Sequence, residues 1–366
     1  MVRWSNLIGM ARIQGPAALG EGPLLYLRNW DIRQKTSKVC WRPERSELRD
    51  KSIHMGAALR QKPTDYFSRD QIRALRKRSS WHATWLLVHC WGVIVATWAV
   101  CALWTNPLVV AVGVVIVGAR QLGLTVLNHD GAHHLLYSNR GLNDWVSEWI
   151  LNRPLFGASV YGYRKSHLEH HKHTQQQGDP DLVLSAPFPI TKESFRRKVW
   201  RDLSGQTGWK QRKEIFVSAF RRTGGPISNR FHRAAYRLGP NLLINVGFLA
   251  GFAACGVWYL YFFLWLLPSM TWLLFISRLR NIGEHACVVD NDDRLLNTRT
   301  TRASWLERVF IAPYWVNYHL EHHLLVSCPC YRLRRAHRIL MDGGHGPAMD
   351  LQPSYAQVIR LATAAA

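Results

Sequence analysis

The chain has 366 residues, with 47 Lys and Arg against 24 Asp and Glu and a formal charge of +23 at pH 7. Such a basic balance is typical of proteins that bind nucleic acid. A nucleic-acid partner is nevertheless not expected, because the charges avoid several long apolar tracts and gather in the segments between them.

The first part of the chain is polar and irregular. Residues 1–62 are rich in Arg, Gly and Pro and show no periodic apolar pattern. They are interpreted either as a disordered extension or as translation from an upstream start codon, with Met55 as the true start. The functional domain is predicted to be 63–366. Near its start, Ser68–Gln71 resembles a capping box and predicts a cationic helix to about Arg78, suited to an anionic membrane surface.

Apolar tracts predict four transmembrane helices. Two runs near 84–104 and 108–127 have about the 20 mostly apolar residues that span a bilayer. The tract 241–277 contains no charged side chain and is long enough for two passes, near 241–257 and 260–280. We therefore expect an all-α fold with four transmembrane helices in two hairpins, and a helical cytoplasmic cap.

The basic residues predict the orientation in the membrane. Lys and Arg fall in 1–83, 128–240 and 278–366, with Arg120 as the exception, and the short connections within the hairpins have none. The positive-inside rule places these basic segments and both termini in the cytoplasm. Within them, 191–220 alternates basic with aromatic and aliphatic residues, which predicts an amphipathic stretch at the interface that also caps the site.

Histidines gather at the predicted cytoplasmic ends of the spans. Of 17 histidines, 11 fall in four clusters, and the string His-Leu-Glu-His-His occurs twice, at His167–His171 and His319–His323. Positions i, i+3 and i+4 of a helix share one face, so each string directs three imidazoles to one place. Neutral imidazole is a common transition-metal ligand. The two strings therefore predict two halves of one metal site.

Two further clusters are expected to complete this site. His133 and His134 follow His129 at i+4 and i+5, and both stay candidates because Gly131 weakens the prediction of an unbroken helix. Asn and His at i and i+4 follow the fourth span. The candidate ligands are His129, His133, His134, His167, His170, His171, Asn281, His285, His319, His322 and His323. So many donors suit two metal ions better than one tetrahedral ion, and imidazoles alone leave iron, copper, nickel or zinc open.

Acidic residues lie next to the candidate ligands, at Asp130, Glu169, Glu284 and Glu321. Metal-bound imidazoles usually donate their second N–H to a carboxylate or carbonyl, and these acids are predicted to accept it. For Glu169 and Glu321, salt bridges with nearby arginines on a helix surface are an equal alternative. Arg120 lies inside a span, where charge is costly, and Asp130 or a substrate head group is its expected partner.

These residues resemble the integral-membrane fatty acid desaturase family. Its three histidine boxes correspond to His129–His134, His167–His171 and His319–His323, borne at the cytoplasmic ends of four membrane helices. Asn281–His285 is similar to the Asn-x-x-x-His element of the stearoyl-CoA desaturases, in which the His is a ligand and the Asn holds the metal through water. The first box is closer to those of bacterial and plant-type desaturases.

The resemblance covers roughly 80–325 and implies a centre of two iron ions that uses O2 to remove hydrogen from an unactivated methylene. It implies a fatty acyl substrate linked to lipid, CoA or a carrier protein, and a bacterial inner membrane. A separate electron donor of ferredoxin, rubredoxin or cytochrome type is expected, because the cysteine spacing of a fused ferredoxin or rubredoxin and the His-Pro-Gly-Gly haem motif are absent from the sequence.

The same boxes serve other reactions. The alternative is therefore a membrane di-iron hydroxylase or ketolase that acts on a lipid, alkane or carotenoid chain. A membrane zinc hydrolase is disfavoured, because the sequence has no His-Glu-x-x-His helix. A metal transporter is also disfavoured, because transporter ligands usually lie near the bilayer midplane.

Overall fold

The computed structural model describes residues 61–157, 159–221 and 227–364, so the predicted extension 1–62 lies almost wholly outside it. The described part is mostly helical, with one parallel pair of two-residue strands. The α-helices are α2 Arg69–Leu75, α3 Ser80–Leu103, α4 Pro107–Ala132, α5 Arg140–Trp145, α6 Val160–His173, α7 Leu182–Ser185, α8 Lys192–Leu203, α9 Gln206–Ala219, α10 Ile227–Ala254, α11 Leu267–Met270, α12 Trp272–His285, α13 Trp305–Phe310, α14 His319–Leu324, α15 Cys330–Asp342 and α16 Tyr355–Ala362. Shorter elements are the π-helices η3 Val146–Asn152 and η5 Phe262–Leu266, the 3-10 turns η2 Pro63–Asp65, η4 Arg153–Leu155, η6 Pro313–Trp315 and η7 Gly346–Ala348, and the strands β1 Thr300–Thr301 and β2 Leu351–Gln352.

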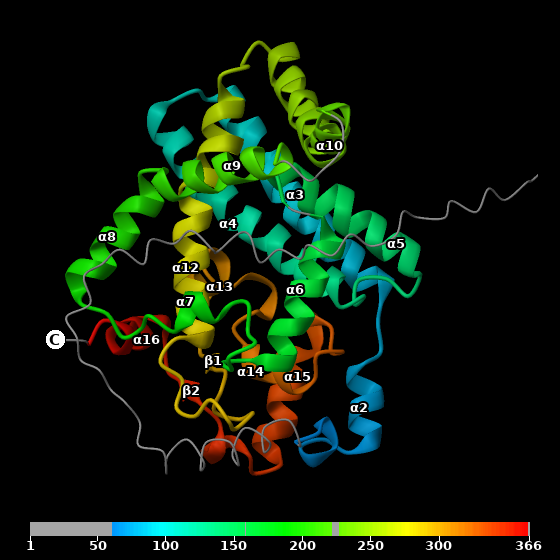
Figure 1. The fold of residues 1–366 in the computed structure, drawn as a ribbon, viewed down its shortest axis with the longest axis vertical. Coiled ribbons are helices and arrows are strands. Elements are labelled where there is room, and N and C mark those ends of the chain that lie inside the picture. The colour runs from blue at the N-terminus through cyan, green and yellow to red at the C-terminus, as the bar shows by residue number, and fades with distance from the viewer. Residues whose placement is uncertain (1–60, 158, 222–226, 365–366) are drawn as a thin grey trace, which may run out of the picture.

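Three helical segments of the described chain are long and apolar enough to cross a membrane: Ser80–Leu103, Pro107–Ala132 and Phe262–His285. They correspond to the first, second and fourth predicted spans. The third predicted span lies in the second half of α10 (Figure 1), which is not among the three. The second half of α10 contains the buried polar side chains of Asn241 and Asn245. A crossing by α10, and hence the count of four, stays a prediction.

The first two candidate spans, α3 and α4, form a hairpin. Helix α4 is the central helix of the molecule (Figure 1). Asn106 caps α4 by accepting the amide of Leu108, and Pro107 occupies the first turn, where its missing N–H has no consequence. From Val117 to Ala132 nearly every side chain of α4 is buried. The C-terminal end of α4 is therefore surrounded by other elements, which contribute the remaining histidines.

The last span is a broken helix. The chain turns after α10, where Gly256 has a φ of 74°, and continues through η5 and α11 into α12. Thr271, with φ −125° and ψ −83°, separates α11 from α12. Because α12 ends only at His285, this predicted ligand lies on the spanning segment itself, a few residues beyond the predicted end at residue 280.

The predicted capping box at Ser68 is confirmed: its hydroxyl accepts the amide of Gln71, and the Gln71 side chain accepts the amide of Ser68. The helix it opens, α2, ends at Leu75 and not near Arg78. The stretch 191–220 forms α8 and α9, with Trp200 and Trp209 exposed.

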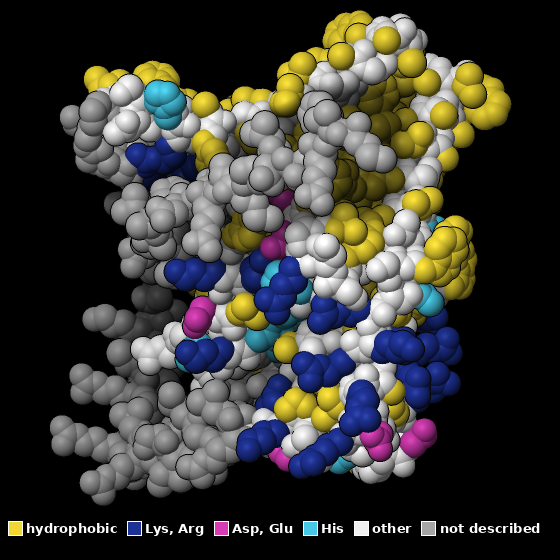
Figure 2. Space-filling view, turned by 90° about the vertical axis from the view of Figure 1, so that its right-hand side faces the viewer, with side chains coloured by type: hydrophobic (Ala, Val, Ile, Leu, Met, Phe, Trp, Pro, Cys, Tyr) yellow, Lys and Arg dark blue, Asp and Glu magenta, His cyan; other side chains and the backbone are white. Residues whose placement is uncertain are grey.

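On one face of the molecule, hydrophobic and cationic side chains lie in different halves. In Figure 2 hydrophobic side chains dominate the upper half, Lys and Arg the lower half, and histidines are visible in a recess between Lys and Arg. The upper half holds the turn between α3 and α4 and the end of α10 (Figure 1). This separation fits a protein that is embedded at one end and faces water at the other.

Candidate metal centre

The histidine clusters meet at the C-terminal ends of α4 and α12, in two adjacent groups. The first group joins five histidines from α4 and its C-terminal cap, α6 and α14: His129, His133, His167, His171 and His322. The second joins four, from α6, α12 and α14: His170, His285, His319 and His323. Within each group, one potential ligand atom per residue lies within 4.8 Å of all the others.

Each His-Leu-Glu-His-His string divides its histidines between the two groups. On α6, His167 and His171 join the first group, and His170 joins the second. On α14 the division is reversed, because His322 alone joins the first group. The two helices therefore hold both groups side by side, as two halves of one centre.

The structure separates the two candidates at the end of α4. His133 caps the helix, one turn after His129, and lies in the first group. At His134 the backbone turns into the left-handed region with a φ of 57°, and its Nδ1 lies 3.3 Å from a carboxylate oxygen of Asp144, away from the group. Gly131 does not break α4, which continues to Ala132. The role of Gly131 is steric, because a Cβ there would lie 2.0 Å from Oγ of Ser147 in η3.

The nitrogen–nitrogen distances fit metal coordination. In the second group Nε2 of His319 lies 2.8 Å from Nε2 of His285 and 3.1 Å from Nε2 of His323. In the first group Nε2 of His171 lies 2.9 Å from that of His167 and 3.0 Å from that of His322. Two nitrogens bound at about 2.1 Å to one metal ion, at a right angle, lie about 3.0 Å apart. One ion could therefore replace these contacts in each group.

Unpaired buried nitrogens support the same reading. Nε2 of His129 and Nε2 of His133 are buried without a hydrogen-bond partner in the described structure. A buried polar atom without a partner is unfavourable and rare. Both atoms belong to residues of the first group, so a metal ion there would satisfy them.

Burial keeps most of the clustered imidazoles neutral, as metal ligation requires. Desolvation, with charge on neighbouring imidazoles as a smaller cause, holds the pKa of His167, His171 and His323 well below the usual value. His170 differs: burial lowers its pKa, but the hydrogen bond to Asp179 and the charge of that carboxylate outweigh burial, and the pKa is raised.

Two residues that hold ligand rings were not predicted from the sequence. Asp179 accepts from Nδ1 of His170 at 2.8 Å, and Oγ1 of Thr174 lies 3.2 Å from Nδ1 of His323. Asp179 also accepts the backbone amides of Gln175 and Asp181. It reaches His170 because the chain reverses after α6, at Gln175 with a φ of 60°. Helical spacing does not predict such a contact. The only sequence signal is that an acidic residue, Asp179, follows soon after the histidine box.

The two glutamates of the repeated string lie in opposite environments, and neither is placed against a ligand ring. Glu169 is exposed and lies 3.6 Å from Nε2 of His173. Glu321 is fully buried and accepts from Nδ1 of His337 at 2.5 Å and from the hydroxyl of Thr300. Each lies on the helix face opposite the histidines. The predicted contact to ligand imidazoles is therefore absent at both positions.

The remaining acidic candidates lie closer to the groups. Asp130 is buried 3.8 Å from Nδ1 of His129, and its other oxygen accepts the amide of Cys330 at 2.9 Å. Glu284 pairs with Arg280 at 2.7 Å and lies 3.7 Å from Nε2 of His319. Asn281, one turn before His285 on α12, is half-buried.

Arg120 does not pair with Asp130, contrary to one of the two expectations. Its guanidinium donates to the backbone carbonyl of Val309 and lies 5.9 Å from the ring centre of Tyr314. The reason is helical geometry: ten residues separate Arg120 from Asp130 on α4, which corresponds to about 15 Å along the axis.

The comparisons with known proteins agree with this geometry. The sequence model of the family "Fatty acid desaturase" matches residues 105–350, which include all nine clustered histidines. The chain therefore belongs to the fatty acid desaturase family, a class of desaturase-type oxidoreductases. Among curated proteins it is similar to the dihydrorhizobitoxine desaturase of Bradyrhizobium elkanii, with 27% identity over 263 residues, which is 70% of each chain.

Proposed function

We propose that this protein is an O2-dependent membrane desaturase that uses two iron ions to introduce a double bond into a fatty acyl chain. The observation that carries the proposal is the division of nine histidines into adjacent groups of five and four, each compact enough to hold one ion. When bound, the two ions would supply the oxidation of an unactivated C–H bond with O2.

The proposed ligands are the nine clustered histidines, with His133 and not His134 from the first box. The second group has one histidine fewer. Asn281 on α12 is the proposed additional residue there, acting through water, on the basis of the family element Asn-x-x-x-His. Asp179 and Thr174 would fix the rings of His170 and His323 so that Nε2 of each faces the ion.

The overall reaction balances with an external source of electrons. A saturated –CH2–CH2– unit, O2, two electrons and two protons give –CH=CH– and two molecules of water. The residues of this chain would hold the ions, shield them from bulk water and present the acyl chain from the membrane. Two of the apolar segments support an acyl substrate, because Pro107–Ala132 ends at His129 and His133 and Phe262–His285 ends at His285.

The name of the relative supports a second candidate substrate. That protein is named for dihydrorhizobitoxine, not for a fatty acid. Desaturation of a molecule other than a fatty acyl chain by the same centre is therefore the alternative, and the expectation of a hydroxylase or ketolase product has no such support.

The proposal is tested by mass spectrometry of total lipids and polar metabolites from a bacterial host that expresses the wild type, His170→Ala or His322→Ala. We expect a wild-type product lighter by two hydrogens in the lipid fraction and iron bound to the purified protein. Both variants should lose the product and most of the iron.

Other products would decide between the alternatives. A two-hydrogen loss confined to the polar fraction would replace the acyl substrate with a small molecule. A product heavier by one oxygen would show a hydroxylase. Full activity in either variant would refute the ligand assignment.

A further inference from the structure

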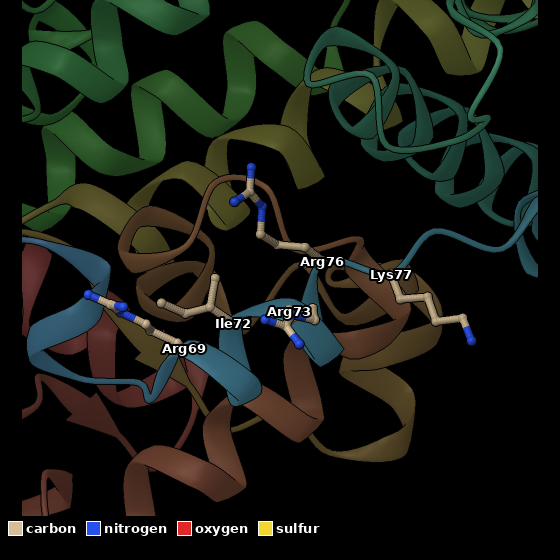
Figure 3. Close-up of a pocket in the computed structure, with 5 residues that line it drawn as sticks. All are labelled: Arg69, Ile72, Arg73, Arg76 and Lys77. Carbon is tan, nitrogen blue, oxygen red and sulfur yellow. The ribbon is translucent and has the colours of Figure 1, made fainter.

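A basic groove lies on the surface formed by α2 and the residues that follow it. It has a volume of about 540 Å³, is open to solvent, and is lined by Arg69, Ile72, Arg73, Arg76 and Lys77. Figure 3 shows the four cationic side chains spreading outward from this short segment, with Ile72 between them. An exposed ion pair of 3.7 Å links Arg73 to Asp70, and such pairs contribute little. The groove therefore presents mostly positive charge.

Helix α15 extends this basic surface. It packs against α2, with Nε of Arg332 donating to the carbonyl of Lys77 at 2.8 Å. Three further arginines of α15 are exposed, at Arg334, Arg335 and Arg338. We call the groove and these three arginines the α2–α15 surface. A surface with this charge attracts and orients acidic partners over a distance.

Two hydrogen bonds connect α15 to the metal centre. At its first residue, the amide of Cys330 donates to Asp130, the neighbour of His129. Further along α15, Nδ1 of His337 donates to Glu321, the neighbour of His322. His129 and His322 both belong to the group of five. Both bonds reach residues that are next in sequence to histidines of the group of five, so Asp130 and Glu321 connect α15 to that group.

The position of the surface favours a soluble partner over a lipid surface. In Figure 1 α2 and α15 lie at the end of the molecule opposite the α3–α4 turn and the end of α10. In the same view α2 lies beyond the start of α3, on the side away from the α3–α4 turn. This placement favours a soluble partner over the predicted contact with an anionic membrane, which is the alternative outcome of the test below.

We propose that the α2–α15 surface is the docking site of a small acidic redox protein that reduces the metal centre through the group of five histidines. The inference rests on the proposed function, which requires two electrons per double bond. Two reduced donors would dock in succession, each giving one electron and leaving oxidised.

The test uses the full-length protein in phosphatidylcholine nanodiscs and a panel of three acidic donors: a plant-type [2Fe–2S] ferredoxin, a rubredoxin and a soluble cytochrome b5 domain. Interferometry gives the Kd for each oxidised donor, with the double variant Arg73→Glu/Arg76→Glu compared with wild type. The matched control is Arg196→Glu/Arg197→Glu on α8, which makes the same charge change at exposed residues. Turnover driven by the donor and by dithionite is measured in parallel.

We expect at least one donor to bind wild type with a Kd that rises with salt, and the α2 variant to weaken that Kd about tenfold or more. The α8 variant should bind as wild type does, and dithionite-driven turnover should be equal in all three proteins. Equal Kd values in the α2 variant and wild type, equal losses in both variants, or no binding by any donor would overturn the proposal.

A lipid occupant and a wrong function give different results. If the α2 variant changes only how turnover depends on added phosphatidylglycerol, the surface contacts the membrane and the proposal fails. If dithionite produces no turnover in wild type, the proposed function fails, while the Kd values still decide whether the surface binds a donor.

Discussion

Asp179 holds the ring of His170, a proposed ligand, from outside the histidine boxes, and its removal should weaken one of the proposed metal sites. In Asp179→Asn the His170 ring loses a buried charged acceptor at 2.8 Å. Loss of such a partner typically lowers metal affinity about 10–100-fold. We expect iron to be lost from the protein at a lower chelator concentration, measured by metal analysis after graded chelation.

The neighbouring Asp181 provides the control for this prediction. Its carboxylate lies 4.0 Å from Nδ1 of His170, and its side chain is 41% exposed. Asp181→Asn should therefore hold iron almost as wild type does. Equal losses in both variants would show that negative charge near the site matters, and not the hydrogen bond of Asp179.

The glutamates of the repeated string should respond differently to the same change. Glu321→Gln removes a buried acceptor of two hydrogen bonds, and bonds to charged groups contribute about 1.5–3 kcal/mol each. Glu169 is exposed, so Glu169→Gln should stay within about 0.5 kcal/mol of wild type. Thermal unfolding in detergent should show a lower midpoint for Glu321→Gln alone; a matching fall in Glu169→Gln would contradict this account.

At the scale of elements, the contact between α4 and η3 sets the position of the first group. Gly131 leaves no room for a side chain, because a Cβ would meet Oγ of Ser147 at 2.0 Å and its Cβ at 2.9 Å. In Gly131→Ala, η3 must move away from the end of α4 that carries His129 and His133. Overpacking of this kind destabilises by about 1–3 kcal/mol, and we expect part of the iron to be lost as well.

A second substitution separates this effect from a general loss of helix geometry. Gly131→Ala/Ser147→Gly restores the space and should recover much of the iron content measured by metal analysis. Gly92→Ala on α3, where a Cβ would meet nothing within 4 Å, is the control and should not reduce stability. If the double variant binds no more iron than the single variant, the contact with Ser147 is not what positions the group.

At the scale of the whole molecule, we predict that α10 crosses the membrane. If it does, the turn after α10 lies on the side opposite the histidines, and the exposed Cys255 in that turn should be labelled by an impermeant maleimide added outside spheroplasts. The protein for this test carries Cys40→Ser and Cys287→Ser, because Cys287 is partly exposed.

A thiol introduced by Arg338→Cys on α15 marks the other side in the same background with Cys255→Ser. It should react only after the spheroplasts are opened. Protection of Cys255 until opening would mean that α10 lies on the membrane without crossing it, and the predicted topology of two hairpins would be wrong.

The sequence by itself determined the class of fold and the type of residue that forms the candidate site. Apolar runs of membrane-spanning length predicted three helices found in the structure, because burial in lipid requires long apolar helices and leaves its mark on composition. Helical spacing predicted which histidines share a face, because i, i+3 and i+4 are fixed by local geometry.

Only the tertiary structure decided how these parts combine. The same string of five residues has an exposed Glu169 in α6 and a buried Glu321 in α14, since α15 and β1 cover one helix and solvent meets the other. The choice of His133 over His134 depends on a left-handed residue, and Asp179 reaches His170 through a chain reversal. Contacts between segments distant in the sequence decide these features, and the spacing of residues along one helix cannot predict such contacts.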